Sequence, residues 1–326
     1  PGFEEILVRG LPIPRYPQLR MGLPSKRALV KLWSARRPDV VHIATEGPLG
    51  WSALGAAQYL RLPVSSDFRT NFHAYTQHYG MGWLQRPMAA YLRKFHNRAD
   101  CTMVPTEALR RQLQTDGFHR LEVVARGVDT ELFVPERRCQ DLRASWGAHA
   151  GALVMACVGR LAPEKNLGLL IETYRAVAQQ RPDTRLLLVG DGPQRAELQA
   201  ACPEALFAGQ RSGEDLAMHY ASADLFVFPS LTETFGNVTV EALASGLPVL
   251  AYDDAAAGQL VRPGVNGLLA APGDAQGFVA AALRLAGDDG LRQSMGPQAR
   301  QTALAQGWSP VIDRFEAVLS RVAMMG

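Results

Sequence analysis

The chain has 326 residues with a formal net charge of +3, and 47% of its residues are apolar and 20% charged. That composition excludes a disordered chain, and the length favours two domains, since a domain holds roughly 100 to 200 residues. No uncharged stretch reaches the roughly 18 residues that a membrane-spanning helix requires.

The first half of the chain alternates apolar, β-rich runs with helical patterns. Strands are predicted at residues 40–44, 64–68, 101–104 and 121–125. Before the third strand, apolar residues recur at helical spacing from Leu84 to Ala99, while Arg86, Arg93 and Lys94 lie on other faces. A basic amphipathic helix of this kind is typical of a surface that rests on an anionic membrane, although such helices more often pack one face on a core.

A charged, proline-containing segment near Pro135 marks the boundary to a second domain. Beyond it, strands at 153–159, 185–190, 225–229 and 247–252 alternate with helices at 166–180, 193–201, 214–222 and 236–245. Three helical segments close the chain, the last of them amphipathic and running from Pro310 to Met324. This alternation predicts parallel sheets wrapped in helices, and a doubly wound second domain whose ligand lies beyond the carboxyl ends of its strands.

Charge and cysteine usage add two expectations. Residues 1–150 carry 21 Lys and Arg against 13 Asp and Glu, whereas the rest of the chain carries 13 against 18. The basic half favours an anionic partner. The four cysteines form no Cys-x-x-Cys pair, which indicates neither a zinc site nor a disulfide framework and favours a reducing cytoplasm.

The strongest motif runs from Glu233 to Glu241, follows a buried strand and opens a helix. Gly236 and Asn237 at the helix start let backbone N–H groups approach an anion, which the helix dipole favours. One carboxylate before the helix and another two turns into it can hold opposite ends of a ligand about 12 Å long. A nucleotide sugar has that length, and its hydroxyls suit ionised carboxylates. In isolation, an ordinary helix-start acid and an exposed helix carboxylate would look the same.

Two further turns follow strands of the second domain. Arg160 and Lys165, after Gly159, can neutralise a diphosphate as a magnesium ion otherwise would, and the chain contains no Asp-x-Asp metal motif. The turn at Gly190 and Gly192 has no third glycine, so it does not meet the dinucleotide fingerprint. It indicates either a tight turn or a close backbone approach to a base or phosphate.

Four motifs stand in series: GRLAPEKN, LLLVGDGPQR, ASADLFVFPSLTETFGNVTVEALASGLPVLAY and RPGVNGLLAAPGD. Together they resemble the retaining glycosyltransferases of family 4, which have the α/β GT-B fold. The resemblance covers the chain from about Arg36 to the last helix. It implies two Rossmann-like, doubly wound domains that face a cleft: an acceptor-side domain at 1–135, a nucleotide-sugar-binding domain at 136–308, and a helix at 309–326 that returns to the first domain.

The same resemblance implies roles for individual residues. Arg160 and Lys165 would contact the donor diphosphate, Glu233 the transferred sugar and Glu241 the ribose. The remaining donor-binding positions would be Gly159, Gly190, Gly192, Phe235, Gly236, Asn237 and Val238.

The chain departs from the family pattern at two places. Family members begin with a strand and a glycine-rich loop, and nothing before Val40 resembles either, so roughly the first 50 to 80 family residues are expected to be missing. A sheet without two of its strands would expose an edge and be poorly stable. Arg69 stands where many relatives carry a histidine, and His73, four residues on, is the candidate to replace it in catalysis or to contact the acceptor.

The expected function is therefore a metal-independent, cofactor-free hexosyltransferase. It would move a sugar from GDP-mannose or a UDP-sugar to a hydroxyl of a lipid or lipid-linked glycan, with retention at the anomeric carbon. The expected location is the cytoplasm or the inner face of the membrane, with an anionic membrane surface as a candidate partner and no nucleic acid. A non-catalytic nucleotide-sugar-binding fragment and a nucleotide-sugar epimerase stay open as alternatives.

Overall fold

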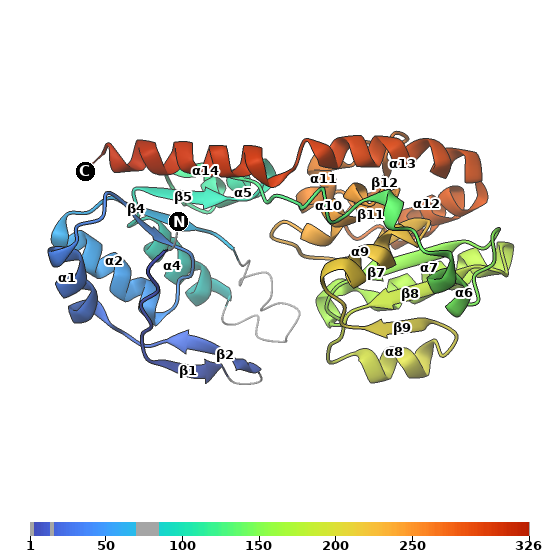
Figure 1. Cartoon of the computed structure of the whole chain (residues 1–326), viewed down its shortest axis with the longest axis horizontal. Coiled ribbons are helices and arrows are strands. Elements are labelled where there is room, and N and C mark those ends of the chain that lie inside the picture. Colours follow the sequence, from blue (N-terminus) through green and yellow to red (C-terminus); the bar gives the residue numbers. More distant parts are fainter. Residues whose placement is uncertain (1–2, 14–15, 70–84, 326) are drawn as a thin grey trace. The chain divides into compact units, whose positions relative to one another are not determined.

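The computed structural model describes residues 3–13, 16–69 and 85–325 (Figure 1). The chain divides into two compact units, one made of residues 1–124 with 312–326 and the other of residues 125–311. They are called the first and the second unit below.

The first unit contains a parallel sheet whose strands follow one another in chain order. The strands are β3 (Val41–Ile43), β4 (Val64–Asp67), β5 (Cys101–Val104) and β6 (Leu121–Val123). All four match strands predicted from the apolar runs. The connecting helices are α2 (Pro48–Leu60), α4 (Gln85–His96) and α5 (Glu107–Thr115).

An antiparallel hairpin and a helix precede this sheet: β1 (Gly10–Ile13), β2 (Tyr16–Gly22) and α1 (Lys26–Ala35). The sequence predicted no element there. Pro12 lies within β1 and Pro17 within β2, and proline is rare in strands because it cannot donate a ladder hydrogen bond. The two prolines are therefore the reason why the sequence pattern did not indicate a hairpin here.

The basic helix α4 packs one face inward, with Leu92 and Phe95 buried, while Arg93 and Lys94 on its other side are exposed. None of the helices in the described part of the chain is long and apolar enough to cross a membrane.

The last helix, α14 (Trp308–Ala323), joins the first unit from Ile312 onward, as the fold resemblance implied. Its apolar stripe buries Val318 and Val322, and Phe315 meets the ring of His42 edge-on at 5.0 Å between centroids.

The second unit contains a six-stranded parallel sheet in the order β12-β11-β10-β7-β8-β9 (Figure 1). Its strands are β7 (Val154–Val158), β8 (Arg185–Val189), β9 (Leu206–Gly209), β10 (Leu225–Phe228), β11 (Val249–Tyr252) and β12 (Gly267–Ala270). From β7 the chain first adds strands on one side and then, from β10, on the other. This reversal is the doubly wound order, and its switch point lies between β7 and β10.

Eight helices among the described residues accompany this sheet. They are α6 (Gln140–Ser145), α7 (Leu167–Gln180), α8 (Arg195–Ala201), α9 (Gly213–Ala221), α10 (Asn237–Ala244), α11 (Ala255–Leu260), α12 (Ala275–Gly287) and α13 (Asp289–Leu304). Because the crossovers run in opposite directions on the two sides of β7, right-handed connections place their helices on opposite faces.

The second unit begins at Ala125, ahead of the boundary expected near Pro135. Val128 and Phe133 belong to its apolar core, and Arg300 donates hydrogen bonds to the carbonyls of Thr130 and Phe133, both at 2.8 Å. The charged segment near Pro135 therefore lies inside the second unit, after residues that already belong to the core of that unit.

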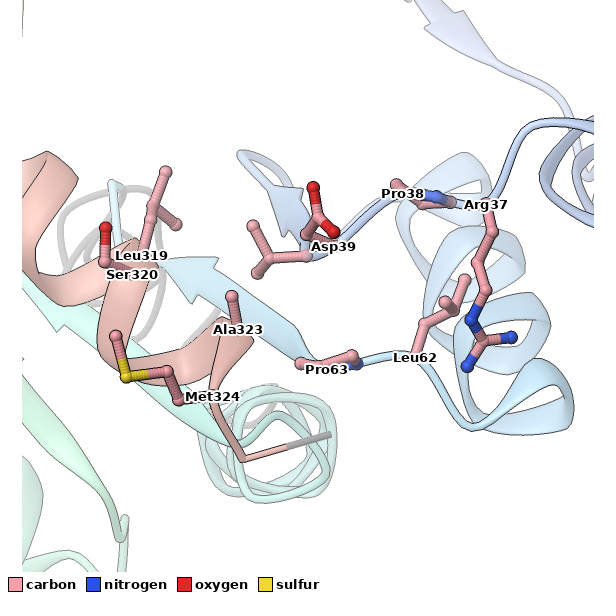
Figure 2. Close-up of a pocket in the computed structure, with 10 residues that line it drawn as sticks. Arg37, Pro38, Asp39, Leu62, Pro63, Leu319, Ser320, Ala323 and Met324 are labelled. Atoms are coloured by element: carbon pink, nitrogen blue, oxygen red, sulfur yellow. The ribbon is translucent and has the colours of Figure 1, made fainter.

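A pocket of about 630 Å³ lies in the first unit, between the end of α14 and the segments that lead into β3 and β4 (Figure 2). Leu62, Pro63 and Ala323 line it, while Arg37 donates hydrogen bonds to the carbonyls of Leu60 and Arg61 that end α2. These are the amino ends of the strands, whereas ligands of such sheets lie at the carboxyl ends. The pocket is therefore not assigned to the functional site.

Candidate functional site

The predicted site residues of the second unit converge on the switch point of its sheet. Gly159, Arg160 and Lys165 follow β7, Gly190 follows β8, and Glu233 follows β10. Because β8 and β10 both pair with β7, these three loops are neighbours at the carboxyl edge. The structure thus brings together motifs that are as many as 74 positions apart in the sequence.

Lys165 and Glu233 form an ion pair across the switch point, with their side chains 12% and 19% exposed. Ser230 donates a hydrogen bond to Oε1 of Glu233 at 2.8 Å, and the ammonium of Lys165 lies 5.3 Å from the ring centroid of Phe228. The pair is therefore held on both sides by residues that end or follow β10.

The loops after β7 and β10 are also joined through their backbones. The amide of Leu231 donates to the carbonyl of Glu164 at 3.0 Å. The Glu164 side chain is fully buried and forms an ion pair with Arg160. The Glu164 carboxylate therefore holds the Arg160 side chain in place, and the Glu164 carbonyl links the loop after β7 to the loop after β10.

A groove of about 330 Å³ continues from this point along the ends of β7, β8 and β9. Its lining includes Gly159, Arg160, Gly190, Asp191 and Arg211. A groove lined by two arginines and by backbone turns suits a ligand that carries an anionic group.

The backbone conformation and a close contact within the protein explain why glycines follow β7 and β8. Gly159 has φ of +147° and Gly190 φ of +135°, in the region that favours glycine. A Cβ on Gly190 would lie 1.9 Å from the carbonyl oxygen of Gly159, and one on Gly192 would lie 2.4 Å from that of Leu161. The close backbone approach in the structure is thus made to the neighbouring loop, and a contact of Gly190 or Gly192 with a base or phosphate stays a prediction.

Helix α10 begins beside the ion pair without a side-chain cap. Its N-cap is Gly236, with φ of +91°, so the amides at the helix start are not engaged by a capping side chain. Phe235 is buried in the core, whereas Asn237 is exposed and Val238 half-buried. Uncapped amides and the positive end of the helix dipole favour an anion at this position.

Glu241 lies one turn further into α10 and is paired from the interior. The hydroxyl of Tyr220, which is completely buried, donates to Oε2 of Glu241 at 2.9 Å. Burial raises the pKa of Glu241, and the hydrogen bond from Tyr220 opposes that rise.

Asp254 is a third carboxylate near Glu233, and the two line one small cavity with Phe235 and Tyr252. Burial raises the pKa of Asp254; the amide of Ala255 opposes that rise, and the charge of Glu233 adds to it. The carboxylate oxygens of Asp254 can accept a hydrogen bond from a sugar hydroxyl.

Two of the predicted positions, Arg69 and His73, belong to the first unit. His73 lies outside the described residues. Arg69 is described, and its Nε donates to Oδ2 of Asp67 at 2.8 Å, at the carboxyl end of β4.

Sequence reasoning did not single out Ser230, Glu164, Tyr220 or Asp254. Ser230 and Glu164 lie inside motifs that were recognised, so their position beside Glu233 and Arg160 was the available signal. Tyr220 had no such signal, because its contact with α10 depends on how two helices pack.

The second unit therefore combines cations and an uncapped helix start, which suit a diphosphate, with carboxylates, which suit hydroxyl groups. Two α/β units with this site at a switch point define the GT-B class of glycosyltransferases.

Comparisons with known proteins agree with this class. The family model described as glycosyltransferase family 4 matches residues 2–132, and the one described as glycosyl transferases group 1 matches residues 152–288. A GDP-mannose-dependent alpha-mannosyltransferase of Mycolicibacterium smegmatis is 38% identical over 316 residues, which cover 94% of this chain and 81% of that protein. The chain belongs to glycosyltransferase family 4.

Two more distant proteins extend the comparison. An alpha-monoglucosyldiacylglycerol synthase of Streptococcus pneumoniae is 28% identical over 71% of this chain and 55% of its own length. Among solved structures, sucrose-phosphate synthase of Thermosynechococcus elongatus superposes with a TM-score of 0.77 at 23% identity, over 92% of this chain and 78% of that one. That likeness shows the GT-B fold, which confirms the fold class predicted from the motifs.

Proposed function

We propose that this glycosyltransferase transfers mannose from GDP-mannose to a hydroxyl group of a lipid or lipid-linked glycan, with retention and without a metal ion. Its 38% identity to a GDP-mannose-dependent enzyme supports the donor, with a UDP-sugar as the alternative. The observation that carries the proposal is the pairing of Lys165 with Glu233 at the switch point, beside the uncapped start of α10.

In this proposal the diphosphate lies between the helix start and the two cations. The bond from the anomeric carbon to the phosphate oxygen breaks, and that oxygen takes the proton of the acceptor hydroxyl as the new glycosidic bond forms. Arg160 and Lys165 stabilise the charge that grows on the leaving diphosphate, which preorganised charges do best when little solvent intervenes. Glu233 orients the sugar ring, and Glu241 accepts hydrogen bonds from the ribose.

The acceptor proposal is supported by charge and by one relative. The first unit, residues 1–124 with 312–326, carries 19 Lys and Arg against 11 Asp and Glu. The exposed Arg93 and Lys94 of α4 offer a surface for anionic lipid headgroups. The streptococcal relative is named as a synthase of a glycosyldiacylglycerol.

A ligand panel followed by thermal unfolding tests the donor. GDP and GDP-mannose are expected to raise the unfolding temperature more than UDP, UDP-glucose, UDP-glucuronate and UDP-N-acetylglucosamine do. A ligand present at about 100 times its dissociation constant adds about 2.7 kcal/mol of stability. Glu241→Ala should remove the stabilisation, whereas Lys31→Ala, at an exposed position of α1, should retain it.

If only the uridine nucleotides stabilise the protein, the proposed donor becomes a UDP-sugar. If neither series stabilises it, the proposed donor site in the second unit is wrong. Product analysis then separates the open alternatives. Sugar transfer that requires acceptor supports the enzyme, binding without turnover supports a non-catalytic fragment, and conversion of the sugar without acceptor supports an epimerase.

A further inference from the structure

Tyr220 of α9 contacts the carboxylate of Glu241 from inside the protein. Its hydroxyl lies 2.9 Å from Oε2 of Glu241 and 3.4 Å from the carbonyl oxygen of Val238. The shorter contact is the stronger hydrogen bond, so the single phenolic proton is directed to the carboxylate. Both acceptors belong to the first two turns of α10, next to the helix start that would hold the diphosphate.

The ring of Tyr220 is fixed by aromatic packing. It meets Phe133 edge-on at 5.7 Å and Phe226 at 5.9 Å between ring centroids. The side chain is completely buried, and a residue so enclosed keeps one rotamer. The hydroxyl is therefore a fixed donor, and the orientation of the Glu241 carboxylate follows from it.

The surroundings of Tyr220 keep its hydroxyl protonated, and the hydrogen bond from this hydroxyl affects the pKa of Glu241. Burial raises the pKa of Tyr220 well above its usual value, and the Glu241 carboxylate adds to that rise. Burial also raises the pKa of Glu241, and the Tyr220 hydrogen bond is the contact that lowers it. A carboxylate that accepts a hydrogen bond in its charged form stays ionised to lower pH.

Other titratable groups on the neighbouring elements are directed elsewhere. His219 of α9 contacts Asp215, and Arg300 of α13 donates to backbone carbonyls that include Ala244. Cys157 of β7 acts on Tyr220 rather than on Glu241, and adds slightly to the rise in the pKa of Tyr220. Among the described residues, Tyr220 is thus the side chain whose hydrogen bond acts on the charge of Glu241.

We propose that Tyr220 is a positioning residue of the donor site, whose hydroxyl orients the Glu241 carboxylate toward the ribose hydroxyls of the nucleotide. The inference rests on the proposed function, because it requires that Glu241 binds the ribose. According to this inference, nucleotide affinity depends on Tyr220, a buried residue of α9, as well as on Glu241 of α10.

The test is the affinity of Tyr220→Phe for two probes, GDP and 2′,3′-dideoxy-GDP, measured by calorimetry between pH 5 and pH 8. The change removes one hydroxyl and keeps the ring. GDP is expected to bind roughly tenfold more weakly, because a hydrogen bond to a charged group is lost. The dideoxy nucleotide is expected to bind both proteins equally, since it offers Glu241 no ribose hydroxyl.

The pH profile gives a second readout. Ionised Glu241 supports GDP binding above its pKa, and affinity falls as the pH drops through that value. Since Tyr220→Phe removes the contact that lowers the pKa, the fall should begin at higher pH than in the unmodified protein. Tyr174→Phe, at another buried tyrosine of the second unit, is the matched control and should leave both readouts unchanged.

The possible outcomes distinguish a failure of the Tyr220 proposal from a failure of the proposed donor site. If the unmodified protein does not bind GDP, or if Glu241→Gln leaves GDP affinity unchanged, the proposed donor site itself fails. If Glu241→Gln weakens GDP but Tyr220→Phe weakens both probes equally, Tyr220 serves folding only. If Tyr220→Phe changes neither probe, the positioning role is likewise overturned while the donor site stands.

Discussion

Lys165→Ala is expected to reduce turnover by roughly 10²- to 10³-fold, the usual effect of removing one preorganised group that stabilises a developing charge. Lys165 is largely buried at the switch point beside Glu233 and the ring of Phe228. A charge held in such surroundings acts on the leaving diphosphate with little screening by water. The measurement is the rate of GDP release at saturating GDP-mannose and acceptor.

The partner of Lys165 allows binding and catalysis to be separated. In Lys165→Ala the Glu233 carboxylate stays in place without its partner cation and repels the donor phosphates, so donor affinity should fall together with turnover. In Lys165→Ala/Glu233→Gln that repulsion is gone. Donor affinity should then recover in part while turnover stays low, a non-additive result that two independent residues would not give.

The controls for this prediction are a conservative and a remote variant. Lys165→Arg keeps the charge and should retain more activity than Lys165→Ala, and Lys31→Ala removes an exposed lysine of the first unit and should behave like the unmodified protein. A Lys165→Ala protein that is folded and turns over within a factor of three of the original would remove Lys165 from the mechanism.

Sequence patterns predicted the parts of the fold that are locally encoded. Most strands of the two sheets were readable because buried parallel strands are short, continuous apolar runs, but β9 and β12 were not predicted. The alternation of strands and helices predicted a doubly wound domain whose strand ends collect Arg160, Lys165 and Glu233. The hairpin before residue 40 was not readable, because its prolines suppress the strand signal.

The support behind the site could not be predicted in the same way. Tyr220 contacts Glu241 only because α9 and α10 pack together, and Glu164 meets the loop after β10 only because β10 pairs with β7. Such contacts depend on tertiary packing, which neither hydrophobic period nor motif spacing encodes. The turn at Gly190 shows the same limit, because its sequence indicated a tight turn or a close approach to a base or phosphate, and not the contact with the backbone of Gly159.

Gly190→Ala is expected to destabilise the protein by about 2 to 6 kcal/mol, since backbone strain and overpacking each contribute about 1 to 3 kcal/mol. The added Cβ would stand 1.9 Å from the carbonyl oxygen of Gly159, and φ at Gly190 is +135°. Relief requires the ends of β7 and β8 to separate, which would break the hydrogen bond from the amide of Gly159 to the carbonyl of Val189. The free energy of unfolding in urea measures the effect.

Gly168→Ala makes the same chemical change under opposite conditions. A Cβ there meets nothing within 4 Å, and the residue lies in α7 with ordinary helical geometry. Alanine is favoured over glycine in a helix by about 0.5 to 1 kcal/mol, so this variant should be slightly more stable than the original protein. If both variants unfolded at the urea concentration of the original protein, the contact between the two strand ends would not hold. Because Arg160 follows Gly159 directly, a separation of those ends that does occur should also weaken GDP binding, which Gly168→Ala should leave unchanged.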